Sequence, residues 1–144
     1  MRSQQMWWNN RRVLLVVLGA VGTLVLSGFV WRYQSRLPMQ ITPETIQLGV
    51  VRPQDVKTQT IRITNPRFVD ATITSLSSSC GCTEITIDGK KQQIVIPAQK
   101  TVRADIKFDG SMHATGDDVN HKLYVQVSQP RGREYVVSIL GSVR

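Results

Sequence analysis

The sequence predicts an all-β domain, an antiparallel β-sandwich of seven to eight strands, preceded by one transmembrane α-helix. Two observations lead to this prediction. Residues 13–31 form one uncharged, largely apolar segment, and after it short runs of alternating apolar and polar residues follow one another to the C-terminus. The first pattern is typical of a helix that crosses a bilayer, and the second is typical of strands with one buried face.

The uncharged segment from Val13 to Trp31 has nineteen residues. At about 1.5 Å per residue, a helix of this length spans roughly the 30 Å hydrocarbon core of a membrane. Aromatic and basic side chains, which are enriched at membrane interfaces, flank it on both sides. They are Trp7, Trp8, Arg11, Arg12, Arg32, Tyr33 and Arg36. We therefore expect this segment to sit in the membrane lipid bilayer.

The charges around the segment predict its orientation. Three arginines precede it and two follow it, and positive charge favours the cytoplasmic side. We expect a single-pass protein of the cell membrane, with a cytoplasmic N-terminus and a periplasmic or extracytoplasmic C-terminal domain. A cleaved signal peptide is the alternative, because the small residues Ser27 and Gly28 follow the apolar core. The absence of an A-x-A-like site and the length of the apolar run favour an uncleaved anchor.

Small residues recur at every fourth position of the segment, at Gly19, Thr23 and Ser27. They share one helix face, on which a second helix can approach closely, so a homodimer through the transmembrane helix is one interpretation. The alternative is that small residues are simply common in membrane helices.

The charge distribution argues against nucleic acid as a partner. Five of the eighteen basic residues lie in residues 1–36, whereas all ten acidic residues lie beyond them, so residues 37–144 carry a net charge of only +3. The remaining basic residues are scattered and lack neighbouring aromatics that would stack on bases. The length suits one domain. We expect a cytoplasmic tail at 1–12, the transmembrane helix at 13–31, a juxtamembrane tether at 32–43 and the sandwich at 44–144.

The strand pattern recurs eight times beyond the tether. The predicted strands are 45–48, 56–64, 71–76, 84–87, 93–96, 101–108, 123–127 and 135–143. Proline and glycine turns separate them, and Asp88-Gly89 is typical of a tight hairpin. Seven or eight short strands in about a hundred residues favour an immunoglobulin-like sandwich.

The motif Cys80-Gly81-Cys82 is the constellation most able to carry chemistry. Three interpretations stay open. The cysteines can be structural fillers with Gly81 shaping the backbone between them. As thiolates, both can bind one Cu(I) or Zn(II) ion. They can also form a disulfide in a small ring and act in thiol–disulfide chemistry. Being two residues apart, they cannot bridge opposite sheets as a disulfide.

A four-ligand zinc site would need help from His113, His121 or Met112. If the predicted strands 84–87, 93–96 and 101–108 are successive antiparallel neighbours, the loops of Cys80 and His113 lie at opposite ends. Copper bound by the two sulfurs alone is then the favoured metal. The histidines are interpreted as surface residues beside a loop.

Other catalytic and metal patterns are weak in this sequence. Asp117 and Asp118 lack the further oxygen ligands of a calcium loop, so we interpret them as a solvated turn. The sequence shows no Ser/His/Asp pattern, no glycine-rich phosphate loop and no spaced carboxylate pair. We therefore expect no enzymatic activity, with thiol-redox chemistry as the remaining exception.

The order of these signals resembles a bacterial Ig-like family of unknown function with a Ser-Cys-Gly-Cys-Thr motif (domain of unknown function 1573). The matching segments are Leu48-Gly49-Val50-Val51, residues 61–65, Ser79 to Thr83, Pro97, residues 106–109, Gly116 and Gly141-Ser142-Val143. Ala98 and Pro66 depart from the family's pattern, each at a position where glycine is common in the family's turns. The resemblance implies an exported, often membrane-tethered sandwich, distantly similar to PapD-like, major sperm protein and ASPM/SPD-2/hydin domains, without an established activity.

Two functional hypotheses follow. The first is a membrane-anchored, non-enzymatic binding or scaffolding domain with an envelope protein as its partner. An exposed edge strand, Tyr124, Tyr135 and the loop at 131–133 are its candidate contacts. The second is a soft-metal, copper-binding or thiol-redox protein that uses Cys80 and Cys82 together.

Overall fold

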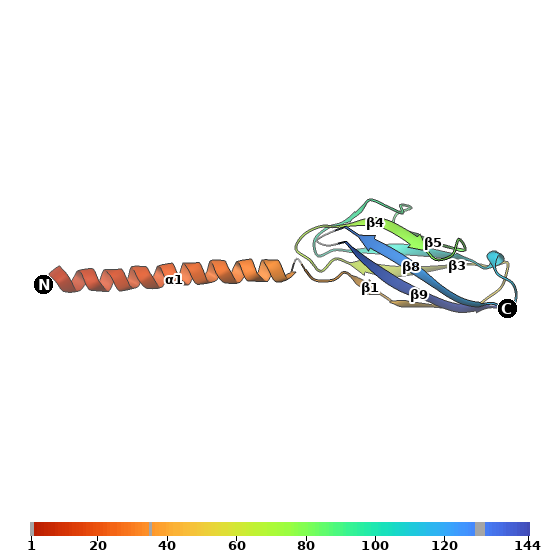
Figure 1. Cartoon of the computed structure of the whole chain (residues 1–144), viewed down its shortest axis with the longest axis horizontal. Helices are drawn as coiled ribbons and strands as arrows, with labels where there is room; N and C mark the ends of the chain where they lie inside the picture. Colours follow the sequence, from red (N-terminus) through yellow and green to blue (C-terminus); the bar gives the residue numbers. More distant parts are fainter. Residues whose placement is uncertain (1, 35, 129–131) are drawn as a thin grey trace. The chain divides into compact units, whose positions relative to one another are not determined.

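The computed structural model describes residues 2–34, 36–128 and 132–144, with side chains from residue 13 onward. It divides the chain into two compact units, Met1–Arg36 and Leu37–Arg144. Figure 1 shows the helix of the first unit and the strands of the second.

The first unit is the helix α1, Arg2–Gln34. Its side chains from residue 13 to residue 33 are exposed, which agrees with a helix whose apolar surface has no protein core to cover it. The stretch Val13–Gln34 is long and apolar enough to be a membrane anchor or a signal sequence. The hydroxyl groups of Thr23 and Ser27 donate to Gly19 O and Thr23 O, both at 2.8 Å, so they are satisfied inside the helix.

The second unit is a sandwich of two sheets, which confirms the predicted all-β class. Its strands are β1 Gln40–Thr42, β2 Thr45–Val51, β3 Val56–Thr64, β4 Ala71–Ser78, β5 Thr83–Thr86, β6 Ile94–Ile96, β7 Thr101–Asp109, β8 Asp118–Val127 and β9 Arg133–Val143. A short 3-10 helix η1, Gly110–Met112, follows β7. One sheet has the order β1-β3-β7-β5 and the other β2-β9-β8-β4-β6. Figure 1 shows β8 and β9 as a long neighbouring pair.

The count of nine described strands exceeds the predicted seven to eight because the chain switches sheets near its start. β1 pairs antiparallel with β3, whereas β2 pairs parallel with β9 in the other sheet. Between them the Thr42–Pro43 peptide is cis, and a proline cannot donate a ladder hydrogen bond there. The alternation seen in the sequence places isoleucine, valine and leucine side chains between the sheets.

One expected neighbourhood in the sandwich is wrong. The segments predicted at 84–87, 93–96 and 101–108 are not successive neighbours, because β6 crosses to the five-stranded sheet and pairs with β4. This leaves β5 paired directly with β7, so Thr83 faces Phe108. The start of β5 therefore lies beside the end of β7, which is the opposite of the expected arrangement.

Two polar side chains are buried at the end of the sandwich opposite to the start of β5 and the end of β7. Asn65 is fully buried and its amide donates to Val69 O at 2.9 Å and Ile96 O at 3.1 Å. Arg67 is 1% exposed, and its Nε donates to Leu37 O at 2.6 Å. The Arg67 bond fixes Leu37, near the start of the second unit, to the sandwich, and Asn65 links the segments around it through backbone acceptors.

Candidate functional site

The Cys80-Gly81-Cys82 motif forms the loop between β4 and β5, and its two cysteines are joined by a disulfide with Cα atoms 5.2 Å apart. The Cys82 N–H points back to Cys80 Sγ at 3.0 Å. Cys82 is 2% exposed and belongs to the core, while Cys80 is half-buried against it. The loop therefore contains one fully buried and one half-buried cysteine.

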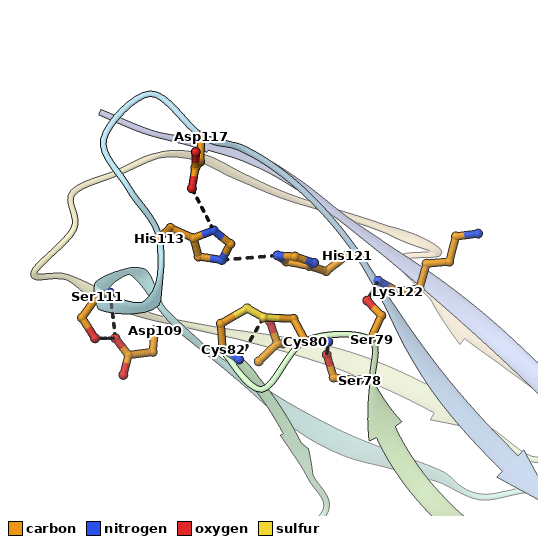
Figure 2. The surroundings of a disulfide bond; sticks show 11 residues. Ser78, Ser79, Cys80, Cys82, Asp109, Ser111, His113, Asp117, His121 and Lys122 are labelled. Carbon is orange, nitrogen blue, oxygen red and sulfur yellow. Dashed lines mark hydrogen bonds and ion pairs between the residues drawn. A yellow bond between two sulfur atoms is a disulfide. The ribbon is translucent and has the colours of Figure 1, made fainter.

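The loop is fixed to strand β8 by Ser79. The Ser79 N–H donates to Lys122 O at 2.9 Å, and the Lys122 N–H donates to Ser79 Oγ at 3.0 Å. These two bonds hold the cysteines beside the residue that precedes Lys122, which is His121 (Figure 2).

His121 reaches the site because of strand parity. Along β8 the odd positions Val119, Leu123 and Val125 point into the core, and His121 shares their face. It lies near the end of the sandwich, so its ring is half-buried rather than fully enclosed.

His113 reaches the site from the other side, after the turn that ends β7. Asp109 begins this turn, because its Oδ1 accepts from the Ser111 N–H at 2.9 Å and from the Ser111 hydroxyl at 2.7 Å. The Asp109 N–H also donates to Cys82 O at 2.8 Å, which ties the turn to the motif. At Gly110 a Cβ atom would lie 2.6 Å from Arg52 O, so the close packing here requires glycine.

The two histidines and two cysteines form one cluster. One ligand atom from each of Cys80, Cys82, His113 and His121 lies within 4.8 Å of the others. The two Nε2 atoms are 3.3 Å apart. Figure 2 shows both imidazoles on the same side of the disulfide. Phe108, which is fully buried, stacks against both rings with centroid distances of 5.4 and 6.4 Å.

The surroundings favour the metal-binding form of His121 and orient the ring of His113. Burial, and then the neighbouring His113, lower the pKa of His121, which favours the neutral ring that a metal ion requires. Asp117 Oδ2 lies 3.6 Å from His113 Nδ1 and accepts from the Ala114 N–H at 2.9 Å. A carboxylate that faces the far nitrogen of a histidine orients the ring and makes it a better ligand.

The cluster suits a tetrahedral metal ion once the disulfide is reduced. Two nitrogens bound at about 2.05 Å to a tetrahedral ion lie about 3.3–3.4 Å apart, and the observed separation of the Nε2 atoms is 3.3 Å. Two thiolates at about 2.3 Å from the same ion would lie about 3.8 Å apart. The histidine pair therefore already has the required spacing, and the sulfur pair would acquire it after the S–S bond breaks.

The structure brings together residues that the sequence analysis had expected at opposite ends of the sandwich. Cys80 and Cys82 lie in the loop between β4 and β5, and His113 and His121 are half-buried beside them, so the interpretation of the histidines as surface residues beside a loop is wrong. The expected placement of the two loops at opposite ends is wrong as well, because β5 pairs directly with β7. His121 lies an even number of residues from the buried apolar residues of β8 and therefore on their face. This spacing was a signal in the sequence that could have identified His121 as a residue of the site.

The other candidates from the sequence stand outside the ligand set. Met112 is 62% exposed, and its methyl carbon lies 3.9 Å from the position of a Cβ built on Gly81, at the rim of the site. Asp117 contacts His113, so it does more than form a solvated turn. Tyr135 is half-buried, and its hydroxyl accepts from the Met39 N–H at 2.9 Å. Arg131, from the loop expected to contact a partner, lies outside the described residues.

The sequence matches the family described as Protein of unknown function (DUF1573) over residues 39–143, which confirms the resemblance. No curated protein matches it in sequence.

Solved structures show the same sandwich at low identity. The ASH/PapD-like domain 7 of human CEP192 is similar with a TM-score of 0.60 and 10% identity, covering 74% of this chain and 84% of that chain. A protein of unknown function from Porphyromonas gingivalis W83 has a TM-score of 0.61 and 10% identity, covering 72% and 46%. The E. coli chaperone DraB has a TM-score of 0.56 and 10% identity, covering 74% and 55%. These similarities confirm the Ig-like, PapD-like fold.

Proposed function

We propose a function for this chain, which belongs to the DUF1573 family: it is a membrane-tethered domain that binds one soft metal ion when its cysteines are reduced. Cys80, Cys82, His113 and His121 are the ligands. The single observation that carries the proposal is the convergence of their four ligand atoms within 4.8 Å from three separate segments of the chain.

The donor set decides which ions fit. Two thiolates and two imidazoles in a tetrahedral arrangement are a typical zinc site, and Cu(I) competes for the same soft sulfurs. Copper was the metal expected when the sulfurs were considered alone. With both histidines present the ligand set has four members, so we propose Zn(II) as the better-fitting ion and Cu(I) as its competitor.

The surroundings support a metal site more than a chance cluster. Asp117 orients His113 through its far nitrogen, and Phe108 provides an apolar floor beneath the rings. A site with an oriented ligand and a dry side holds an ion more firmly than ligands in open solvent. Ser79 and Asp109 fix the two loops that carry the ligands.

The apolar part of helix α1 supports a location at the cell envelope. The stretch Val13–Gln34 suits a single membrane crossing, and the arginine distribution favours a cytoplasmic N-terminus with the metal site on the outer side. A cysteine pair in such an oxidising compartment forms a disulfide unless it is reduced or bound to metal.

The test is metal binding by the full chain in detergent micelles. The protein is reduced with a phosphine, freed of reductant under nitrogen, and titrated with Zn(II) or Cu(I) against a chromophoric chelator. We expect one ion per chain, and a loss of affinity beyond the roughly 10–100-fold of outer-shell changes in Cys82→Ser and His121→Asn. Lys122→Ala, an exposed neighbour, is the matched control. A reduced wild-type chain that binds neither ion would overturn the proposal.

Protein binding is the second candidate, and the free sheet edges favour it. Lys57 Nζ donates to Leu48 O at 2.7 Å and Val50 O at 2.8 Å, so the β2 edge is partly occupied. β6 lies at the other edge of that sheet, and its Val95 is 54% exposed. An extended segment of an envelope protein can add to such an edge. A photo-crosslinking residue at Val95 should capture one defined protein in intact membranes, whereas the same residue at Thr58 should not. Equal labelling at both positions would argue against this candidate.

A further inference from the structure

We infer that thiol–disulfide exchange with a dithiol protein opens and closes this metal site, and that the exchange enters at Cys80. This inference rests on the proposed function, because it describes how the ligand pair becomes available. The structure supports it through the unequal burial of the two cysteines and through the position of the histidines beside them.

The two cysteines differ in what can reach them. Cys82 is 2% exposed, and its Sγ lies 3.5 Å from Thr83 Oγ1 in the core. Cys80 is half-buried on the loop, next to the exposed Gly81. An external thiolate must approach the sulfur it attacks along the S–S axis, so we expect the less buried Cys80 to be the target.

The surroundings also suit the groups that the exchange releases. When a partner thiolate bonds to Cys80 Sγ, the S–S bond breaks and its electron pair leaves on Cys82 Sγ. Both imidazoles lie near this sulfur, and an imidazole N–H can donate a hydrogen bond to the thiolate. The Cys82 N–H, 3.0 Å from Cys80 Sγ, can in turn stabilise a thiolate at Cys80.

The complete exchange is balanced with a dithiol as the reductant. A second thiolate of the partner attacks its own sulfur in the mixed disulfide and releases Cys80 as a thiolate. The partner leaves as a disulfide, and this chain keeps two thiolates beside two imidazoles. A metal ion can then bind all four groups.

The reverse exchange expels the ion. A disulfide of the partner accepts two electrons from the Cys80 and Cys82 thiolates and takes up two protons to become a dithiol. The new S–S bond removes both sulfur ligands together, because sulfurs bonded to each other cannot also stand about 3.8 Å apart around a tetrahedral ion. Two imidazoles alone hold the ion weakly, so oxidation releases it.

The entry at Cys80 is tested with two single-cysteine chains in detergent micelles. Cys82→Ser leaves Cys80, and Cys80→Ser leaves Cys82. With 5,5′-dithiobis(2-nitrobenzoic acid) as the probe, we expect Cys80 to react at least about tenfold faster than Cys82, and both to react equally in denaturant. Equal rates in two chains that keep the wild-type circular dichroism would overturn the inference.

A measurement on the wild-type chain avoids any folding defect of these variants. The disulfide form is treated with glutathione, quenched with N-ethylmaleimide and mapped by peptide mass spectrometry. Glutathione should be found on Cys80 and the maleimide on Cys82. The reverse assignment would overturn the entry at Cys80.

The gating is tested on the reduced, zinc-loaded chain. Oxidised glutathione should release one zinc ion for each disulfide formed, measured with 4-(2-pyridylazo)resorcinol. A disulfide that forms while zinc stays bound would overturn the gating. If the reduced chain binds no metal, the proposed function fails, whereas the glutathione mapping still decides separately where exchange enters.

Discussion

The two ends of the sandwich contain polar side chains in different ways. At the end that receives the first residues of the second unit, Asn65 and Arg67 are buried and donate to backbone carbonyls. At the end that carries the cysteine loop, His113 and His121 are half-buried and their closest polar neighbours are each other and a carboxylate. The buried donors at the first end have acceptors inside the protein, whereas the imidazoles at the second end lie beside two sulfurs, which is the arrangement that the proposed metal site requires. The comparison predicts that stability resides at the first end and chemistry at the second.

The largest effect on stability is expected at Arg67. Arg67→Ala would empty the largest fully buried side-chain volume and leave Leu37 O without this donor. We expect the free energy of unfolding to fall by about 3–5 kcal/mol, as for other large buried truncations, measured by denaturant unfolding of the full chain in micelles. Arg103→Ala, an exposed arginine on β7, is the control, with a change within about 0.5 kcal/mol. Similar losses of unfolding free energy in both variants would contradict the expectation that stability resides at the first end.

Asn65→Ala tests the same end without removing a charge. The amide donates to Val69 O, Ile96 O and Pro97 O, so the change leaves buried acceptors unpaired. We expect a loss of about 2–3 kcal/mol, because each unmet buried group costs about 1–3 kcal/mol and some of these regain water. Thermal unfolding monitored by circular dichroism measures it, with the exposed Asn120→Ala as control. A melting temperature as high as that of the control would contradict this account.

The double variant Cys80→Ser, Cys82→Ser sharpens the comparison at the reactive end. The disulfide closes a loop of three residues, so its chain-entropy contribution is small, about 1–2 kcal/mol. We expect the β-sheet circular dichroism to persist and metal binding to disappear. Unfolding of this variant at ambient temperature would instead show that the motif is structural.

The smallest effect is expected at Asp117, whose carboxylate faces His113 without being a ligand itself. Asp117→Asn should weaken metal binding about tenfold and leave the free energy of unfolding within about 0.5 kcal/mol. Asp118→Asn, at a more exposed neighbour that faces Arg144, is the matched control for chelator competition. Equal metal affinities in the two variants would show that Asp117 does not support the ligand His113.

The sequence by itself determined the features that depend on local periodicity. The uncharged segment at 13–31 predicted the apolar part of α1, and alternation predicted strands such as β3 and β7 because each buries one face. The Ser79 to Thr83 motif, together with the other matching segments, identified the family. The two cysteines were recognised as candidates for chemistry because their spacing is visible in the chain.

Tertiary structure alone decided which segments meet at the cysteines. The short strand β6 has the same alternating pattern as β5 and β7 in the sequence. It nevertheless pairs with β4 in the five-stranded sheet, which lets β5 pair with β7 in the four-stranded sheet. This choice depends on long-range hydrogen bonds and core packing, which local periodicity does not record. It brings His113 and His121 to the cysteines, and so turns two sulfurs into a cluster of four ligands.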